Sequence, residues 1–363
     1  MQVFERTSNL KIKVLSLSQN LGRMARKKKR NPRIESLEIV KYAAEGKGLG
    51  YYEDKVVFVA NVIPGDVVEA QVSKKRKNYY EAFPVQFLAY SEDRVAAFCE
   101  HFGVCGGCKW QNLPYEKQLA AKEQEVLDNL GRIGKVDIEE ILPIKGAAEQ
   151  EFYRNKLEFT FSADRWLTKE EVESGKDIEQ EPALGFHVPR FFDKVVDIQK
   201  CFLQPEPSNP IRNAIREYAL ERNLSFFHLR EQQGFLRTLI IRTASTGEVM
   251  VILSLFHEDK EEREALLDML VEKFPMITSL NYVINEKKND TITDQEIICY
   301  KGQPYIEEEM EGLRFRIGPK SFYQTNSAQA YELYKVVRDF SGLTGKEIVY
   351  DLYTGTGTIA NFV

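Results

Sequence analysis

Runs of alternating apolar and polar residues dominate the chain from about position 36 to position 92. Such alternation places every second side chain on one face of a strand. The runs are short and closely spaced, and Pro64 and Gly65 between two of them are typical of a tight turn. This spacing predicts a small closed β-barrel over residues 36–92. Its predicted strands are Leu37–Tyr42, Lys55–Val62, Val67–Val72 and Tyr80–Tyr90, with Gly46–Gly50 as a turn.

Residues 93–310 alternate between helical and strand patterns and predict a central α+β domain. Two apolar runs on either side of Ala244–Gly247 predict a hairpin. Pro114 precedes a segment with helical periodicity, which is a typical helix start. The predicted helices are Tyr115–Ile133, Pro207–Arg222 and Lys260–Phe274, and the predicted strands are Asn155–Ser162, Phe235–Thr243 and Glu248–Phe256.

The pattern changes again from residue 311. Leu313–Ile317 predicts a strand and Ser327–Phe340 a helix, whereas Glu347–Leu352 has the continuous apolar pattern of a buried strand and runs into a glycine turn. A strand, a glycine turn and a helix start normally open a doubly wound, Rossmann-like domain of roughly 150 residues or more. Only the first unit of such a domain precedes Val363. The chain is therefore expected to be C-terminally truncated, with a partial domain over residues 311–363.

Composition places the chain among ordinary globular proteins, with 43% hydrophobic residues and a formal net charge of −5. The sequence contains no apolar run of membrane-spanning length and no secretory pattern at its start. We therefore expect a cytoplasmic protein without membrane contact and, since no protein partner is indicated, a monomer. Residues 1–35 are basic and lack hydrophobic periodicity, which predicts a disordered lead with Met24 as an alternative start.

The distribution of basic residues carries more information than the net charge. One run covers Arg23–Arg30 with Arg33 just after it, and a second covers Lys74–Lys77. A single charge run is usually a solvated face. Two runs that flank one small β-rich region favour instead an RNA or DNA backbone as the partner.

Four of the five cysteines have a pattern typical of a metal site. Cys99, Cys105 and Cys108 lie in one segment, and Cys201 lies far downstream. The Cys105-Gly-Gly-Cys108 pair brings two thiolates together across a turn, for which glycine permits unusual backbone conformations. Four thiolates suit either tetrahedral zinc or an iron–sulfur cluster, and the single C-x2-C pair favours the cluster. Cys299 lies in an apolar run and is expected to pack in the core.

The glycine turn near the end of the chain predicts a cofactor site. Gly355 and Gly357 follow Asp351 and the predicted strand. Glycines in this place let the backbone approach a ligand at the carboxyl end of the strand. The pattern favours S-adenosylmethionine. A dinucleotide remains the alternative, because Ala360 is a permitted substitute for the third glycine of G-x-G-x-x-G.

Several motifs resemble those of one enzyme family. Ala44–Tyr80 resembles a TRAM domain, an RNA-binding barrel of RNA-modifying enzymes. Cys99-x5-Cys-Gly-Gly-Cys-x-Trp-Gln111 resembles the iron–sulfur motif of the 23S rRNA (uracil-5-)-methyltransferases, which belong to the TrmA-type RNA (uracil-5-)-methyltransferase family. The resemblance covers residues 36–363. The occurrence of the barrel, the cysteine motif and the methyltransferase motifs in this order is more specific than any one of them. Further family-like motifs are Tyr153–Lys156, Gly185–Cys201, Gly318–Asn326 and Asp351–Gly357.

The resemblance implies a multidomain α/β fold with an OB-like TRAM barrel, a central α+β domain and the start of a Rossmann-like methyltransferase domain. It implies S-adenosylmethionine-dependent methylation of a uridine at C5, in 23S rRNA first and tRNA second. It also implies a 4Fe–4S cluster, or alternatively zinc, on Cys99, Cys105, Cys108 and Cys201. The implied cofactor-binding residues are Gln324, Tyr353, Gly355, Gly357 and Thr358, the last at a position where the family often has Asn.

The RNA-binding residues that we expect are Phe322, Lys47, Lys74, Lys75, Arg76 and Lys77. The resemblance puts Phe322 where the family has an aromatic ring near the target base. An exposed ring there would stack on a flipped base, and its alternative role is ordinary core packing.

The chemistry of the family needs two groups that this sequence does not show. A cysteine thiolate attacks C6 of uracil, and a carboxylate base later removes the C5 proton. The Ser-Cys-Asn-Pro motif that carries the nucleophile is absent from the 363 residues, as is the His-rich motif of the base, and Cys299 in Ile-Ile-Cys-Tyr does not resemble it. Both motifs are expected beyond Val363, so the chain is predicted not to methylate RNA by itself.

Two alternatives stand behind the rRNA uridine methyltransferase. One is a tRNA uridine methyltransferase of the same family, and the other is a non-catalytic RNA-binding module with a structural metal. Methylthiolating radical enzymes also pair a TRAM barrel with a cluster, but they use C-x3-C-x2-C and carry the barrel last. Here the first cysteine spacing is five and the barrel comes first, which disfavours them.

Overall fold

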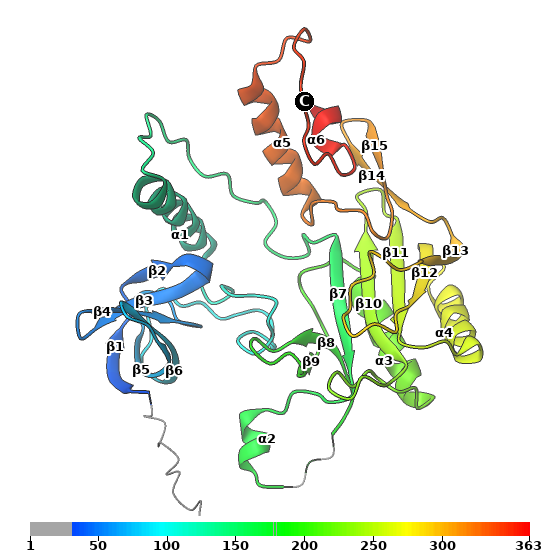
Figure 1. Cartoon of the computed structure of the whole chain (residues 1–363), viewed down its shortest axis with the longest axis horizontal. Helices are drawn as coiled ribbons and strands as arrows, with labels where there is room; N and C mark the ends of the chain where they lie inside the picture. The colour runs from blue at the N-terminus through cyan, green and yellow to red at the C-terminus, as the bar shows by residue number, and fades with distance from the viewer. Residues whose placement is uncertain (1–30, 177, 179) are drawn as a thin grey trace, which may run out of the picture.

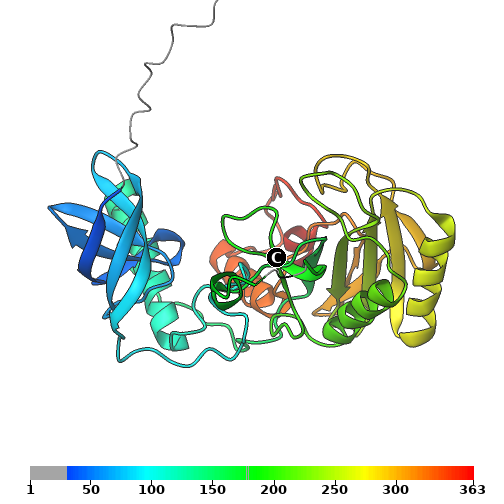
Figure 2. The same cartoon turned by 90° about the horizontal axis from the view of Figure 1, so that it is seen from below.

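The computed structural model describes residues 31–363 apart from positions 177 and 179 (Figure 1). The predicted basic run Arg23–Arg30 lies outside the described residues. A β-barrel and a larger mixed sheet lie side by side in two perpendicular views, with helix α1 (Tyr115–Asp128) along the barrel (Figures 1 and 2). A π-helical turn, Asn129–Gly134, continues α1. None of the helices that the structure describes is long and apolar enough to cross a membrane.

The N-terminal sheet closes into a barrel through one bent segment. Its strand order is β1-β5-β6-β4-β3-β2, and β1 and β2 are consecutive in the chain. Between them, the amide of Ile39 donates to the carbonyl of Asp66, just before β5, and the amide of Val40 to the carbonyl of Leu49 in β3, so this segment joins the two ends of the strand order. Closure leaves no free sheet edge there. The strands are β1 (Arg33–Glu38), β2 (Lys41–Ala43), β3 (Lys47–Tyr52), β4 (Lys55–Val59), β5 (Val67–Lys75) and β6 (Tyr79–Ala89).

Two boundaries predicted for this region are wrong. The predicted turn Gly46–Gly50 is mostly strand, because the turn is Ala44–Gly46 and β3 begins at Lys47. Gly50 allows close packing of strands, since a Cβ there would lie 2.4 Å from the carbonyl oxygen of Glu38. The lead was predicted to extend to residue 35, but β1 begins at Arg33, whose Nη2 donates to a carboxylate oxygen of Glu69 at 2.6 Å.

The central sheet has the strand order β13-β12-β11-β10-β7-β8-β9 within the described residues. Only β11 and β12 pair in parallel, and helix α4 (Lys260–Lys273) connects them, as a parallel pair requires. The predicted hairpin is confirmed as β10 and β11. The strands are β7 (Lys156–Ser162), β8 (Ala183–His187), β9 (Val195–Asp197), β10 (Leu236–Thr243), β11 (Val249–Leu255), β12 (Ile277–Ile284) and β13 (Ile298–Gly302).

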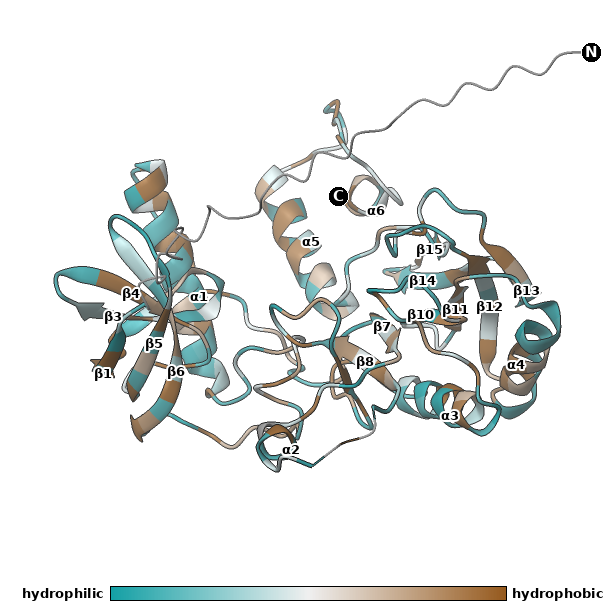
Figure 3. Ribbon diagram, turned by 60° about the horizontal axis from the view of Figure 1, so that its bottom comes forward, coloured by the Kyte–Doolittle hydropathy of each residue, from teal (hydrophilic) through white to brown (hydrophobic). Residues whose placement is uncertain are grey.

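Each face of the central sheet is covered by its own set of elements. Alternate residues of β7, β10 and β11 form one core with helices α3 (Ser208–Glu221) and α4. The other residues form a second core with the hairpin β14 (Ile306–Met310) and β15 (Leu313–Ile317) and with helices α5 (Ser327–Ser341) and α6 (Thr358–Phe362). Figure 3 shows hydrophobic residues on the central strands and hydrophilic residues over much of α3. The helices predicted at these places are confirmed.

The sequence patterns did not predict a short helix α2 (Lys169–Glu173) or strands β8, β9, β12 and β14. The predicted strand Glu347–Leu352 is wrong, because these residues form no strand and Ile348 is 83% exposed. No described strand pairs with this segment, and a buried parallel strand needs neighbours on both sides. Cys299 was predicted in the core but is only half-buried, on the edge strand β13.

Candidate functional site

The four cysteines of the predicted metal site line one small cavity. Cys99, Cys105 and Cys108 come from the loop between the barrel and α1, and Cys201 comes from the segment before α3, where it is 8% exposed. Cys299 does not line this cavity, and all five cysteines are free thiols. The tertiary structure therefore gathers the four residues that the spacing grouped and leaves out the fifth.

Close backbone packing holds the cysteine loop in place. The amide of Gly106 donates to the carbonyl oxygen of His187 at 3.1 Å, and a Cβ at Gly106 would lie 2.7 Å from that oxygen. Glycine is therefore needed there for close approach. The sequence analysis attributed these glycines to unusual backbone conformations. That reason is wrong, because neither Gly106 nor Gly107 has a positive φ. The amide of Gly107 donates to Sγ of Cys105 at 3.4 Å.

Burial sets the protonation of Cys105, Cys108 and Cys201. It raises the pKa of Cys105 to about 11, against a partial offset from the Gly107 amide, and the neighbouring thiols raise it further. Burial likewise raises the pKa of Cys108 and of Cys201. Without a bound positive charge these thiols stay protonated at neutral pH, whereas a metal ligand must be a thiolate.

A buried cation lies next to the cysteine cavity. The side chain of Arg212 has no exposed surface, and its Nη1 donates to Oδ1 of Asn209 at 3.0 Å. The same Asn209 oxygen accepts from the amide of Cys201 at 2.8 Å. Burial lowers the pKa of Arg212 to about 10, and the largest effect that raises this pKa is the Coulombic interaction with Cys201. Arg212 forms no direct ion pair with any described carboxylate, although the charges of Asp197 and Glu206 act on it, so a negative group in the cavity would offset its charge further.

The four thiols share a cavity but do not converge on a point. Within residues 31–363, leaving aside the two undescribed positions, no three His, Cys, Asp or Glu side chains are grouped so that they could hold a metal ion. A tetrahedral zinc site would need four sulfurs at about 2.3 Å from one centre. The structure thus does not show the predicted metal site, although it brings the cysteines together.

The loop between β15 and α5 presents Phe322 to solvent. Phe322 is 72% exposed, whereas the next residue, Tyr323, is 7% exposed and packs in the core. On one side, Nη2 of Arg242 donates to the carbonyl oxygen of Ser321 at 2.7 Å. On the other side, Nδ2 of Asn155 donates to the carbonyl oxygen of Gln324 at 2.8 Å. The exposed ring thus stands on a loop that two side chains of the central sheet hold in place.

The same hydrogen-bond network reaches a buried carboxyl group. Nδ2 of Asn155 also donates to Oγ of Ser327 at 2.8 Å, and that hydroxyl donates to Oε1 of Glu308 at 3.0 Å. Glu308 is 2% exposed, and its Oε2 has no hydrogen-bond partner among the described residues. Burial raises the pKa of Glu308, against partial offsets from the hydrogen bonds of Ser245 and Ser327. The network links the start of α5 to the loop of Phe322.

The glycine turn has the backbone conformation that its glycines predict. Gly355 and Gly357 have φ of 56° and 74°, in the left-handed region that favours glycine. The amide of Ala360 donates to Oδ2 of Asp351 at 3.2 Å, so Asp351 orders the turn. Tyr353 is fully exposed, but Thr358 is 7% exposed.

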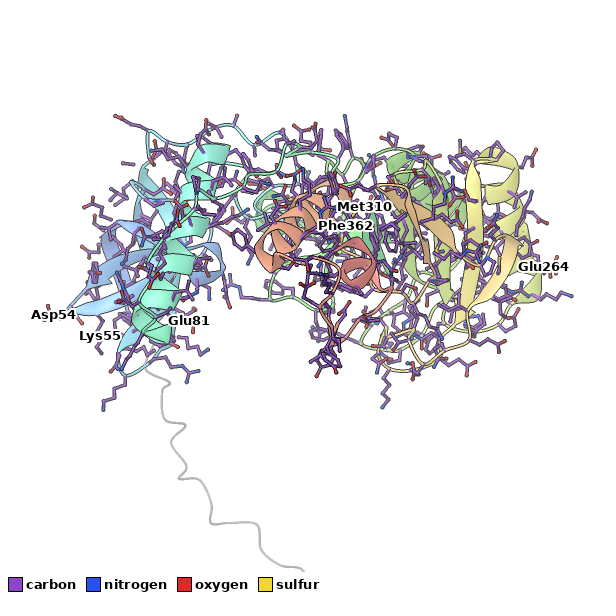
Figure 4. All side chains as sticks on the ribbon, turned by 90° about the horizontal axis from the view of Figure 1, so that it is seen from above. Asp54, Lys55, Glu81, Glu264, Met310 and Phe362 are labelled. Carbon is purple, nitrogen blue, oxygen red and sulfur yellow. The ribbon has the colours of Figure 1, made fainter. Side chains whose placement is uncertain are left out.

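The last helix anchors this turn to the sheet. Phe362 belongs to the same core as Met310, and the two lie close together in Figure 4. The hydroxyl of Thr358, the first residue of α6, lies 2.8 Å from the hydroxyl of Thr356, and the two form a hydrogen bond.

The basic residues predicted to bind RNA lie at two ends of the barrel. Lys47 begins β3, and the next residue, Gly48, pairs with Val59 at the end of β4. Lys74–Lys77 instead lead into β6, whose first residue, Tyr79, pairs with Val56 near the start of β4. Lys55, at that start, lies at the extremity of the molecule away from the central sheet in Figure 4. The barrel therefore separates Lys47 from the second basic run.

Lys47 itself pairs with Glu45 at 2.8 Å, and Lys74 pairs with Glu81 at 3.2 Å. Nζ of Lys75 lies 5.4 Å from the centre of the Tyr80 ring, and Arg76 and Lys77 are exposed.

A groove of about 720 Å³ runs between the barrel, the cysteine loop, α1 and the start of α5. It passes Gly46 of the barrel and Cys108 and reaches Asn326, two residues after Gln324. Lys109 and Lys122 line it and were not predicted as site residues. Their signal in the sequence was weak, because isolated lysines on a loop and a helix are ordinary surface residues.

Asn155 and Arg242 were also missed as supports of the Phe322 loop. Asn155 lies in the quoted motif Tyr153–Lys156, which singled it out without a role. Arg242 lay inside a predicted strand, where only the tertiary contact with Ser321 gives it meaning.

Comparison with protein families and curated proteins gives consistent matches. The family model of the TRAM domain matches residues 34–85. An uncharacterized RNA methyltransferase of Bacteroides thetaiotaomicron is 57% identical over 324 residues, which cover 88% of this chain and 71% of that protein. An uncharacterized RNA methyltransferase of Porphyromonas gingivalis is 57% identical over 332 residues, which cover 90% of this chain and 71% of that one. One from Chlorobaculum tepidum is 37% identical over 336 residues, or 91% and 69% of the two chains.

A solved structure shares the fold. The tRNA (uracil-54, C5)-methyltransferase of Pyrococcus abyssi, in complex with S-adenosyl-L-homocysteine, matches with a TM-score of 0.62 over 89% of this chain and 69% of that one. Its sequence identity is 24%, so this likeness concerns the fold alone.

Proposed function

Since the chain belongs to the RNA methyltransferase family, we propose that it serves the S-adenosylmethionine-dependent methylation of a uridine in RNA at carbon 5. The observation that carries this proposal is Phe322, an exposed ring on a loop that Arg242 and Asn155 hold from both sides. Such a ring is suited to stack on a base taken out of its helix. The shared fold with a tRNA (uracil-54, C5)-methyltransferase supports uracil as that base.

The methyl donor would bind at the glycine turn. A Cβ at Gly355 would meet only the carbonyl oxygen of Tyr353 at 3.9 Å, so the backbone there is open to a close ligand. S-adenosylmethionine supplies the methyl group when bound. Gln324, Tyr353, Gly355 and Gly357 would hold it, and Thr358, with its hydroxyl bonded to Thr356, would support the turn. Gln324, which would contact the methyl donor, lies two residues after Phe322, which would contact the base. Donor and base would therefore meet at the same loop.

The RNA would follow the groove between the barrel and the central sheet. Lys47 lies next to Gly46 at the groove end of the barrel. The groove itself is lined by three lysines and three glutamates: Lys109, Lys122, Lys145, Glu45, Glu125 and Glu149. Cations along such a path neutralise phosphates, which gives RNA affinity without sequence preference. Lys74–Lys77 would bind a more distant part of the same RNA at the far end of the barrel. We propose 23S rRNA as the substrate, with tRNA as the alternative.

Mapping of 5-methyluridine in cells without this gene tests the proposal. Mass spectrometry should show that one 23S rRNA position loses its methyl group, and that the intact gene restores it. Phe322→Ala should restore it roughly 5- to 100-fold less well, since base stacking contributes about 1–3 kcal/mol. Phe340→Ala is the matched control, because Phe340 is 74% exposed but lies on α5. Loss from tRNA would identify tRNA as the substrate, and no loss from either RNA would contradict the proposal.

We also propose that the cysteine cavity holds a 4Fe–4S cluster. Two observations support a thiolate-bound metal here: four cysteines line one cavity, and the buried Arg212 lies beside them. The single C-x2-C pair favours a cluster over a zinc ion. A thiolate-bound cluster is larger than one ion and anionic. The cysteines would then join the loop of Cys99–Cys108 to the segment of Cys201, which is a structural role beside the RNA groove.

Iron and sulfide analysis of the chain purified without oxygen tests the cluster. We expect about four iron atoms and four sulfides per chain. Cys105→Ser should abolish iron binding, and Cys299→Ser should retain it, because Cys299 lies outside the cavity. A colourless protein with one zinc per chain would establish the zinc alternative, and a metal-free protein would contradict both.

A further inference from the structure

A separate cavity of about 310 Å³ opens beside strands β7, β8 and β10. Its more buried part includes Thr238, which is buried, and its direct cross-strand neighbour Thr160 and His187, which are half-buried. Its exposed part includes Phe192 and residues 288–290. The volume lies at the lower end of the range for small-molecule sites, so the cavity can admit one nucleotide-sized group. Of these residues only His187 also contacts the site described above, through its backbone carbonyl, which accepts from the amide of Gly106.

The buried part offers neutral hydrogen-bonding groups. Oγ1 of Thr160 lies 3.3 Å from Nε2 of His187, and the hydroxyl of Thr238 stands beside them on the next strand. Burial lowers the pKa of His187, so the ring is neutral at pH 7. Hydroxyls and a neutral imidazole both donate and accept hydrogen bonds, as recognition of a base edge or a ribose hydroxyl requires.

A buried guanidinium supplies positive charge to the wall. Arg237 is 3% exposed and packs against two neighbouring aromatic rings, with its guanidinium 4.6 Å from the ring centre of Phe227 and 5.7 Å from that of Phe256. Its Nη1 donates to the carbonyl oxygens of Asn285 and Lys287, at 2.6 Å each. These contacts fix its position and orient the loop that carries residues 288–290.

The charges of the cavity sum to a positive value. Lys288 is exposed at the opening, and neither Lys288 nor Arg237 forms an ion pair with a carboxylate in the part of the chain that the structure describes. Asp290 is the one carboxylate of the lining, against these two cations. A phosphodiester would find Lys288 free of an ion pair among the described residues, whereas the charge of Asp290 partly offsets that of Arg237.

Phe192 provides a platform at the opening. Its side chain is 62% exposed, and the guanidinium of Arg230 lies 5.5 Å from the ring centre. Arg230 is held there by an ion pair with Asp193. Exposed aromatic rings beside cations are the usual stacking sites for bases of single-stranded nucleic acids.

Strand β10 connects this cavity to the loop of Phe322. Thr238 and Arg242 lie on the same face of β10, four residues apart, which corresponds to about 13 Å along a strand. Arg242 binds the carbonyl of Ser321, next to Phe322. The exposed Glu158 of this face forms an ion pair with Lys156, so its charge is offset.

We propose that this cavity binds a second nucleotide of the RNA strand whose uridine stacks on Phe322. The base would stack on Phe192, and the phosphate would lie against Lys288 and Arg237. This inference rests on the proposed function, because it needs RNA as the ligand. Two fixed points along one strand would set the direction of the RNA and limit which uridine reaches Phe322.

Binding of a fluorescein-labelled single-stranded oligouridine to the full chain, followed by anisotropy over a salt series, tests the inference. Phe192→Ala should weaken binding by roughly 5- to 100-fold, the range for loss of one stacked base. Phe340→Ala, at a comparably exposed ring on α5, should have no effect. Lys288→Met should reduce the slope of log K against log salt by about 0.7, the value for one phosphate contact. Lys273→Met, at the exposed end of α4, should leave the slope unchanged.

The outcomes separate this inference from the function on which it rests. If Phe322→Ala weakens binding but Phe192→Ala and Lys288→Met do not, the cavity is no RNA subsite and the proposed function stands. If the unaltered chain does not bind the oligouridine, RNA binding itself fails. Circular dichroism of each variant checks folding, and Thr160→Val, which removes one hydroxyl at nearly constant volume, should weaken binding by a smaller factor than Phe192→Ala.

Discussion

The cysteine cavity and the glycine turn are the two places where a cofactor is expected, and they are built in opposite ways. The cavity joins segments that lie far apart in the chain, and its support includes the fully buried Arg212. The turn consists of consecutive residues beside the exposed side chains of Ile348 and Tyr350, which are 83% and 81% exposed. A site made by tertiary packing shares the stability of the core, whereas a local turn is nearly independent of it.

This difference predicts where substitutions act. Near the cavity, a change should alter folding and ligand binding together, because the same contacts serve both. Near the turn, a change should alter ligand binding with little effect on the free energy of unfolding. Matched pairs of substitutions, one in each region, test this distinction.

The largest difference is expected between two isoleucines. Ile241 on β10 has no exposed surface, so Ile241→Ala should lower the free energy of unfolding by about 2–5 kcal/mol. Ile348→Ala should change it by less than about 0.5 kcal/mol, because Ile348 is exposed. Urea denaturation measures both. Equal losses would mean that the segment 347–352 is packed in solution and would break the comparison.

Two asparagines give the next largest difference. Asn209→Ala would leave the Cys201 amide and Nη1 of Arg212 without their shared acceptor, at a cost of about 1–3 kcal/mol, and should lower the iron content. Asn361→Ala on α6 would remove one exposed hydrogen bond to the Gly357 carbonyl and should cost much less. Urea denaturation and iron analysis of both variants give the measurement. Full iron binding by Asn209→Ala would contradict a supporting role for Asn209.

Two glycines distinguish steric from conformational requirements. Gly106→Ala should cost about 1–3 kcal/mol, because the added Cβ would lie 2.7 Å from a carbonyl oxygen. Gly355→Ala has open space and should cost about 1 kcal/mol, which reflects only its positive φ. Calorimetric titration with S-adenosylhomocysteine should show weaker binding for Gly355→Ala and not for Gly106→Ala. The reverse result would place the cofactor away from the glycine turn.

The smallest effects are expected from two glutamates, and their pH dependence should have opposite signs. Burial raises the pKa of Glu308 above 4.5, so its protonated form is favoured in the folded state. Its contribution to stability is present below pH 4.5 and is lost as the pH rises through the raised pKa. Glu308→Gln should remove this loss, so the variant gains stability relative to the unaltered chain as the pH rises.

Glu347, in the exposed segment, should behave in the opposite way. Hydrogen bonds from Thr344 lower its pKa to about 2, so its contribution is present above pH 4.5 and is lost as the pH falls toward 2. Urea denaturation of Glu308→Gln and Glu347→Gln between pH 3 and pH 7 compares the two; slopes of the same sign would contradict these pKa shifts.

Much of the local structure follows from the sequence. Helix α1 and the hairpin of β10 and β11 have clear periodicity, and the structure forms both at the predicted places. The prediction failed for Glu347–Leu352, whose apolar pattern matches a buried strand that has no described neighbour to pair with. It also failed at Gly46–Gly50, because glycine serves close strand packing as well as turns.

The candidate site shows the same limit. The spacing of Cys99, Cys105 and Cys108 marked a common ligand set, and the motif around Phe322 marked an exposed ring. Neither pattern indicated Arg212, Asn155 or Arg242, because each of these acts through a contact with a distant segment. Their residue types alone are ordinary for a surface.

The sequence by itself determined the secondary structure with strong periodicity and the grouping of Cys99, Cys105 and Cys108, because both depend on the spacing of neighbouring residues. Only the tertiary structure decided that Cys201 joins the loop of Cys99–Cys108 and that Lys47 and Lys74–Lys77 lie at opposite ends of a barrel. Periodicity sets which face of an element is apolar. Which faces meet depends on the shape and burial of surfaces that are distant in the chain, and no local pattern contains that information.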